Sequence, residues 1–305
     1  MHVTNRPFEL AGSDFEKMWR LLQQDYAQKQ DHFIWLCSRL GEWKFDLWNE
    51  KKYIPSFFQD HAQLWVNDFD QLLGFVLSED GENIFFILTL PGYDYLYSDI
   101  LDWTIQNWGQ RYAALKTEVH EYQVEALKLL EDRGFRSLGA AATTRQYDLS
   151  AKRDAAINLA AGHRIVDLGE NGDYQAKALL NVNANDNRNQ VSEFDLLRFA
   201  YSRQNPAYDP AFDLSVINAD GLHVASCVGF KDPAYRVAEI EKVCTHQDYR
   251  RQGLAGAVIR TCFQRLAAIG IETAYITGYS GAANGLYEKL GPCKHKQWFH
   301  YELVG

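Results

Sequence analysis

The stretch THQDYRRQGLAGAVIR, residues 245–260, places two arginines and two glycines at the start of an apolar helical pattern. Glycine in a first turn lowers helix propensity by about 1 kcal/mol relative to alanine, so some gain must offset that cost. Backbone N–H groups at a helix start have no intrahelical partner, and the helix dipole is positive there. Such a terminus binds anions, phosphates above all, and the sequence therefore predicts a phosphate site at this turn.

The elements that must position this turn follow from the hydrophobic pattern. Leu254, Val258, Cys262 and Leu266 recur every four residues, which predicts an amphipathic helix that Gly270 ends. Alternating and apolar runs predict the strands around it. We expect a hairpin and a third strand before the turn, then a strand, a short helix and a closing strand after it, at residues 212–218, 223–230, 235–245, 272–279, 282–291 and 296–304.

The first half of the chain repeats this order. Strand-like runs at residues 63–68, 72–78 and 83–90 precede a helical pattern at 98–108. A low-information segment at 150–164 separates the two blocks, which indicates a duplicated domain. We therefore predict one domain at 1–149, a linker at 150–164 and a second domain at 165–305, in an α/β or α+β class.

Composition and charge exclude several classes of function. The formal net charge is −9, and residues 1–150 carry 14 Lys and Arg against 23 Asp and Glu, without a basic stripe for nucleic acid. The sequence has no run of about 18 apolar residues, so we expect no membrane-spanning helix. The five cysteines are odd in number and lack metal-ligand spacing, so we expect no metal and a cytoplasmic protein with reduced thiols.

The turn also carries a family signature. Arg250, Gly253 and Ala255 occupy the fixed positions of [R/Q]-x-x-G-x-[G/A], Gly256 follows, and an Asn-x-x-Tyr helix comes about 30 residues later. Residues 212–304 thereby resemble the core of the GNAT (GCN5-related) N-acetyltransferases, and the duplicated layout resembles the tandem-GNAT proteins. The resemblance implies two domains, each a twisted mixed β-sheet flanked by helices.

The resemblance also implies acetyl-CoA as cofactor and names the residues that bind it. Backbone N–H groups of the loop would hold the pyrophosphate, Val243 N–H would face the acetyl carbonyl, and Thr245 and Asn284 would contact the pantetheine arm. The cofactor-binding residues expected on this basis are Val243, Cys244, Thr245, Arg250, Arg251, Gln252, Gly253, Leu254, Ala255, Gly256, Asn284 and Tyr287.

Acetyl transfer needs a base for the attacking amine, whose free pKa is near 10, and an acid for the leaving thiolate. Glu239 and Glu241 alternate on the third strand, so they share one face with Val243 unless a bulge shifts the register. Both are candidate bases, and Glu241 lies nearer the expected thioester. Tyr287 stands at the family's general-acid tyrosine. Cys244 alternates away from the glutamates, and we interpret it as a core residue rather than a nucleophile.

The first half lacks these features. At the place of the phosphate loop it reads PGYDYLYSDIL (91–101), and Leu127 and Leu130 replace the asparagine and the tyrosine. The expected function is therefore acetyl-CoA-dependent N-acetylation of a primary amine, in a ternary complex at the second domain only. We expect a small-molecule amine, because no peptide groove can be read. The alternative is a non-catalytic sensor or scaffold that binds acetyl-CoA or another acyl-CoA.

Overall fold

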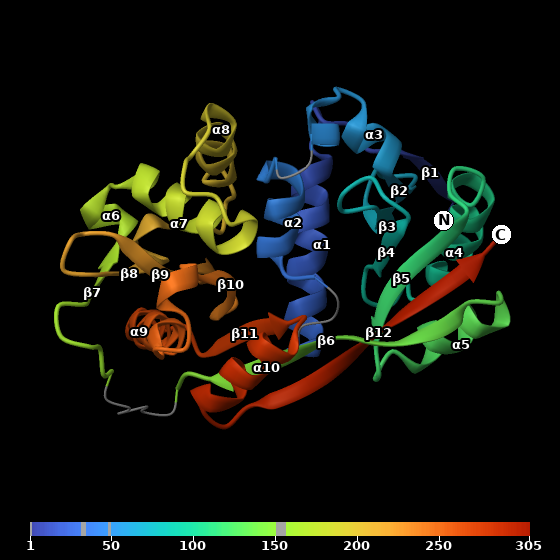
Figure 1. Cartoon of the computed structure of the whole chain (residues 1–305). Coiled ribbons are helices and arrows are strands. Elements are labelled where there is room, and N and C mark those ends of the chain that lie inside the picture. Colours follow the sequence, from blue (N-terminus) through green and yellow to red (C-terminus); the bar gives the residue numbers. More distant parts are fainter. Residues whose placement is uncertain (1, 32–34, 48–49, 151–156) are drawn as a thin grey trace. The chain divides into compact units, whose positions relative to one another are not determined.

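The computed structural model describes residues 2–31, 35–47, 50–150 and 157–305 (Figure 1). The chain forms two compact units: residues 1–43, 47–142 and 296–305 make the first, and residues 44–46 and 143–295 make the second. In the described ranges, no helix combines the length and the apolar character needed to cross a bilayer.

The first unit is a mixed sheet with helices. Strands β1 to β4 pair antiparallel in sequence order, β4 pairs parallel with β5, and the final strand β12 pairs antiparallel with β5. Its elements are β1 (Val3–Pro7), α1 (Asp14–Lys29), α2 (Cys37–Phe45), the 3₁₀ turn η1 (Glu50–Tyr53), α3 (Phe57–His61), β2 (Ala62–Asn67), β3 (Leu72–Leu77), β4 (Ile84–Thr89), α4 (Leu96–Trp108), β5 (Ala114–His120), α5 (Val124–Asp132) and β12 (Lys294–Val304).

The second unit repeats this plan. Strands β7 to β10 pair antiparallel in sequence order, β10 pairs parallel with β11, and β11 pairs antiparallel with residues 143–148 of β6. Its elements are residues 143–148 of β6 (Arg136–Asp148), β7 (Arg164–Asp167), α6 (Leu168–Asn171), α7 (Tyr174–Asp186), α8 (Glu193–Ser202), η2 (Pro210–Phe212), β8 (Asp213–Ile217), β9 (His223–Asp232), β10 (Val237–Thr245), η3 (Gln247–Tyr249), α9 (Leu254–Ala268), β11 (Thr273–Gly278), α10 (Gly281–Tyr287) and η4 (Glu288–Leu290).

The predicted mixed α/β class and the predicted order of strands and helices in the second block are confirmed. One strand assignment is wrong. The strand expected to close the second domain pairs with β5 of the first unit, from Trp298 opposite His120 to Val304 opposite Ala114. The corresponding edge of the second sheet is filled instead by residues 143–148. The predicted linker 150–164 includes residues 151–156, which lie outside the described residues.

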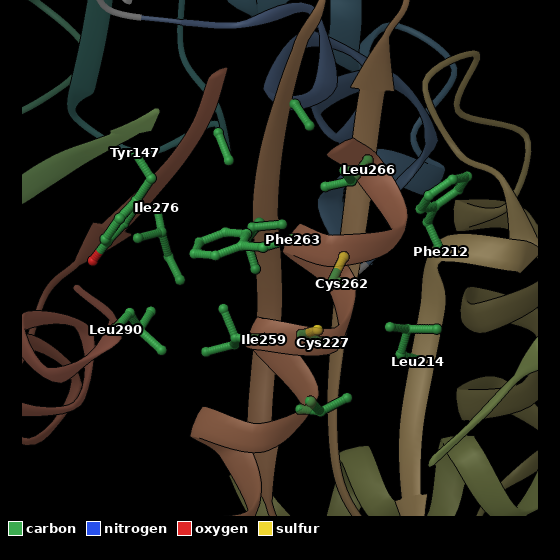
Figure 2. Close-up of a cluster of buried hydrophobic side chains, with 14 of the residues drawn as sticks. Tyr147, Phe212, Leu214, Cys227, Ile259, Cys262, Phe263, Leu266, Ile276 and Leu290 are labelled. Carbon is green, nitrogen blue, oxygen red and sulfur yellow. The ribbon is translucent and has the colours of Figure 1, made fainter. Parts of the chain in front are cut away.

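The core of the second unit lies between its sheet and helix α9. Figure 2 shows Ile259, Cys262, Phe263 and Leu266 of α9 beside strand residues such as Cys227. These side chains are nearly or fully buried, and burying one large apolar side chain stabilises a fold by about 1.5–3 kcal/mol. The apolar face of α9 thus fixes the helix on the sheet and places its N-terminal turn at the end of β10.

Candidate active site

Strands β10 and β11 separate part of the way along their length. Their parallel pairing runs from Val237 opposite Thr273 to Glu239 opposite Tyr275, although β10 continues to Thr245 and β11 to Gly278. Beyond Glu239, β10 stays paired with β9 on its other side. The open edge of β10 past Glu239 therefore presents backbone groups that no strand pairing of the described sheet uses.

A β-bulge sits in this open part. The register with β9 shifts between Glu241, opposite Val228, and Cys244, opposite Ser226, so Lys242 and Val243 together face one residue of β9. Lys242 has a φ of 51°, a left-handed conformation that non-glycine residues seldom adopt. Because of the extra residue, Val243 pairs with neither β9 nor β11. Its backbone N–H can therefore donate a hydrogen bond to the carbonyl of a bound molecule.

The bulge corrects the prediction for Cys244. Residues directly opposite each other in a ladder share a face, and Val228 and Ser226 are two residues apart on β9. Cys244 therefore lies on the same face as Glu241, not away from it. Val243 turns to the other face and packs against the core. The thiol of Cys244 is nonetheless buried, which raises its pKa, so it stays protonated and unreactive.

The two candidate bases differ in their surroundings. Glu239 lies within the paired part of the sheet and is 3% exposed. Glu241 lies beyond the last β10–β11 pair and is only partly buried. Glu241 is therefore the candidate at the open edge of β10, whereas Glu239 lies inside the paired sheet.

The loop from Arg250 to Gly256 leads from β10 into α9 with a bare helix start. Gly253 is the N-cap residue, in a left-handed conformation (φ 78°), and no side chain caps the helix. The first helical hydrogen bond runs from Ala257 N–H to Gly253 C=O, so the preceding N–H groups lie outside the ladder. A side chain caps every other α-helix of the described second unit: Asp167 in α6, Asp173 in α7, Ser192 in α8 and Ser280 in α10.

The space in front of this turn is open. No heavy atom lies within 4 Å of the position that a Cβ on Gly253 would take. Arg251 and Gln252 are exposed beside it, whereas Leu254 is buried in the core and Gly256 packs close to Leu286. The chain thus offers unpaired amides and room for an anion, which fits a bound diphosphate.

The end of helix α7 anchors the chain that leads into this loop, and no pattern in the sequence predicts these contacts. Arg250 donates from Nη2 to the carbonyl of Ala184 at 2.9 Å, so its side chain holds the loop rather than standing free. Asn183 accepts from Gln247 N–H with its side chain and from Gln247 Nε2 with its carbonyl, both at 3.0 Å. Asparagine and arginine are common surface residues, and nothing local in the sequence marks these long-range bonds.

Helix α10 brings Asn284 and Tyr287 to the tip of β11. Asn284 Oδ1 accepts from Arg145 Nη1 at 2.6 Å, and its Nδ2 donates to the carbonyl of Gly278 at 3.4 Å. A Cβ on Gly278 would lie 2.5 Å from Asn284 Oδ1, so only glycine allows this approach. Arg145 and Gly278 therefore set the position of α10, although neither belongs to the motif that identified it.

Tyr287 is buried, with 6% of its surface exposed, and its carbonyl accepts from the hydroxyl of Tyr147 at 2.7 Å. Burial and the negative charge of Glu241 raise the pKa of Tyr287 above its usual range. The phenol therefore stays protonated at neutral pH, as a proton donor must. The electrostatic coupling indicates that the side chains of Tyr287 and Glu241, which come from two different elements, lie near each other.

A cavity of about 280 Å³ lies beside the bulge of β10 in the second unit. Helices α7 and α8 form its walls, and both charged and apolar side chains face it. Its lining consists of Asp46, Ala178, Asn181, Val182, Asn185, Asp186, Asp195, Arg198, Phe199, Ser202, Lys242, Val243 and Cys244. Asp46 comes from a segment that no motif singled out.

Comparisons with known proteins agree with this geometry. The profile of the acetyltransferase (GNAT) family matches residues 179–291. Among curated protein sequences, none is significantly similar to the chain.

Solved structures resemble the whole chain. A tandem GNAT protein from the clavulanic acid biosynthesis pathway is 14% identical with a TM-score of 0.66, covering 100% of this chain and 99% of its own. A GCN5-related N-acetyltransferase from Sphaerobacter thermophilus is 17% identical with a TM-score of 0.63, covering 99% and 95%. A GNAT-family acetyltransferase from Colwellia psychrerythraea is 13% identical with a TM-score of 0.59, covering 98% and 99%.

Proposed function

We propose that the second domain acetylates a primary amine of a small molecule with acetyl-CoA. The match of residues 179–291 to the profile of the acetyltransferase (GNAT) family supports this proposal, as does the likeness of the whole chain to the fold of a tandem GNAT protein. The observation that carries this proposal is the uncapped start of α9 next to the open edge of β10. The proposed diphosphate site is the start of α9, and the proposed thioester site is the bulge of β10, the strand that leads into the loop before α9.

Acetyl-CoA would supply the acetyl group, activated as a thioester. Glu241 accepts a proton from the substrate ammonium, directly or through water, so that the neutral nitrogen can bond to the acetyl carbon. Val243 N–H stabilises the negative charge that develops on the acetyl oxygen. Tyr287 gives its proton to the sulfur as the carbon–sulfur bond breaks. The nitrogen of the tetrahedral intermediate gives up its second proton, which returns through water to the phenolate of Tyr287, and Glu241 releases its proton to solvent. The products are an amide and the free thiol, and Cys244 takes no part.

The cavity supports a small acceptor. Its volume of about 280 Å³ lies near the lower end of the range for small-molecule pockets. It adjoins Lys242, Val243 and Cys244, the part of β10 where the acetyl group is expected. We propose that the acceptor amine enters from this cavity.

We also propose that the first domain has lost its cofactor site. Tyrosines stand where its loop would need a free backbone, and Leu130 is fully buried in place of the motif tyrosine. The five cysteines are free thiols in the structure, which supports the proposal of a reducing, cytoplasmic setting.

Amine-dependent release of the coenzyme A thiol tests the proposed reaction. With a panel of small primary amines, at least one should raise thiol release well above the rate of spontaneous hydrolysis. The same panel with longer acyl-CoAs shows the acyl preference. If acetyl-CoA binds but no amine raises the rate, the sensor or scaffold alternative is correct and the enzyme assignment is wrong.

A further inference from the structure

Asp46 is a buried carboxylate between two cations at the cavity. Residues 44–46 belong to the second compact unit although they lie early in the sequence, and the Phe45 ring packs 5.8 Å from the ring of Tyr201 in α8. Asp46 accepts from Lys242 Nζ at 2.6 Å and from Arg198 Nε at 3.1 Å. It thereby connects the bulge residue of β10 with helix α8.

Two cations face the carboxylate of Asp46. Burial alone would raise the pKa of Asp46, but the charges and hydrogen bonds of Lys242 and Arg198 bring it down to about 2. Asp46 is therefore ionised at neutral pH and holds the Nε side of Arg198. A partly desolvated guanidinium favours a ligand of opposite sign.

Arg198 has N–H donors that do not contact Asp46. Its Nε is bonded to Asp46, whereas no partner for Nη1 or Nη2 is found in the described part of the chain. The side chain is 40% exposed and lines the cavity. The free end of a guanidinium presents parallel N–H donors that match a carboxylate, and the bond to Asp46 fixes its orientation.

The other charged groups of the cavity are already paired. Asp195 accepts from Arg188 at 2.8 Å through each oxygen and also from Ser192. Asp186 pairs with the same Arg188 at 3.0 Å and is half exposed. Asp186, Asp195 and Arg188 together carry one net negative charge and offer no site for an anion, so the anion site is the one at Arg198.

We propose that the acceptor is an amino-acid-like molecule, whose carboxylate binds to the free end of Arg198 while its amine reaches the acetyl group. This inference rests on the proposed function. The cavity joins Arg198 and Phe199 of α8 to Val243 of β10, so one small molecule can contact all three. Asp46 is a positioning residue that aims Arg198, and it completes the site from the first half of the sequence.

Matched pairs of amines test the proposal. Thiol release from acetyl-CoA is measured with β-alanine against propylamine, 4-aminobutyrate against butylamine, and phenylalanine against phenethylamine. In at least one pair, we expect kcat/KM to be tenfold or more higher for the carboxylate-bearing member, about 1.4 kcal/mol.

Variants assign that preference to Arg198. Arg198→Gln should raise KM for the preferred amine about tenfold with little change in kcat, and should remove the advantage over its uncharged partner. Arg198→Lys should restore part of it, and Asp46→Asn should weaken it without changing the KM for acetyl-CoA. Arg265→Gln is the matched control, because Arg265 is similarly exposed and pairs with Asp167 elsewhere in the same unit.

Each other outcome has a definite meaning. Equal use of both members of every pair, equal loss for both in Arg198→Gln, or turnover of uncharged amines alone would overturn the carboxylate site while leaving the acetyltransferase proposal intact. Binding of acetyl-CoA without turnover of any carboxylate-bearing amine would also overturn it. Failure to bind acetyl-CoA, measured separately by calorimetry, would instead contradict the proposed function.

Discussion

Replacing Tyr287 with phenylalanine is expected to lower kcat about 100-fold, within the range for loss of a general acid. The phenol is buried, and burial and the charge of Glu241 raise its pKa, so the wild-type protein keeps the phenol proton at neutral pH. Phenylalanine keeps the ring in the core and removes only the donor. Steady-state kinetics with a saturating amine measures the change, and calorimetry should show an affinity for acetyl-CoA within about twofold of wild type.

Tyr208→Phe is the control for that measurement. Tyr208 donates to Asp213 at 3.0 Å in a buried network of the same unit and does not line the cavity. Its loss should lower the free energy of unfolding by about 1–3 kcal/mol, the cost of an unmade buried hydrogen bond, and leave kcat unchanged. Equal activity of Tyr287→Phe and wild type would remove Tyr287 from the mechanism.

Replacing Glu241 with glutamine should lower kcat/KM at neutral pH by about 100-fold, because a carboxamide cannot accept the proton of an ammonium. The deficit should shrink as pH approaches 10, where a free alkylamine loses its proton without help. Glu239→Gln, at the more buried position, should have a smaller effect on the pH profile. The measurement is kcat/KM from pH 6 to 10 for both variants.

Glu272→Gln provides the matched control for charge removal, since Glu272 is exposed and pairs with Arg236 on the surface of the same unit. It should follow the wild-type profile throughout. A Glu241→Gln profile parallel to wild type, combined with loss of the acid limb in Glu239→Gln, would transfer the base role to Glu239.

The strands β8 to β11 and the helices α9 and α10 could be predicted because each has a strong local pattern. The four-residue recurrence from Leu254 to Leu266 appears as the buried face of α9, and the hairpin runs appear as β8 and β9. The helix start at Gly253 could be predicted for the same reason, since glycine followed by an apolar helical pattern is a local signal.

The bulge in β10 could not be predicted in this way. It depends on one lysine in a left-handed conformation, and lysine carries no sequence signal for that conformation. A single extra residue reverses the side to which every later side chain points, which is why the predicted orientation of Cys244 was wrong although the residue is buried as expected.

Long-range partners lay beyond local reasoning as well. Asp46 meets Lys242 across 196 positions, and Arg145 meets Asn284 across 139. The exchange of strands is a third example. Residues 143–148 and 296–304 both form strands, and the strand that each one pairs with depends on the whole fold rather than on its own sequence.

The proposed diphosphate site at the start of α9 is tested most directly by calorimetric titration of acetyl-CoA into the wild-type protein and the variants Gly253→Leu and Gly270→Leu. Both glycines have left-handed backbones at opposite ends of α9, and neither has a heavy atom within 4 Å of its Cβ position, so both substitutions cost about 1–2 kcal/mol of strain. If the bare start of α9 holds the diphosphate, Gly253→Leu should weaken binding at least tenfold, about 1.4 kcal/mol, and Gly270→Leu should bind like wild type. Equal affinity for all three proteins, or no binding by wild type, would contradict the account.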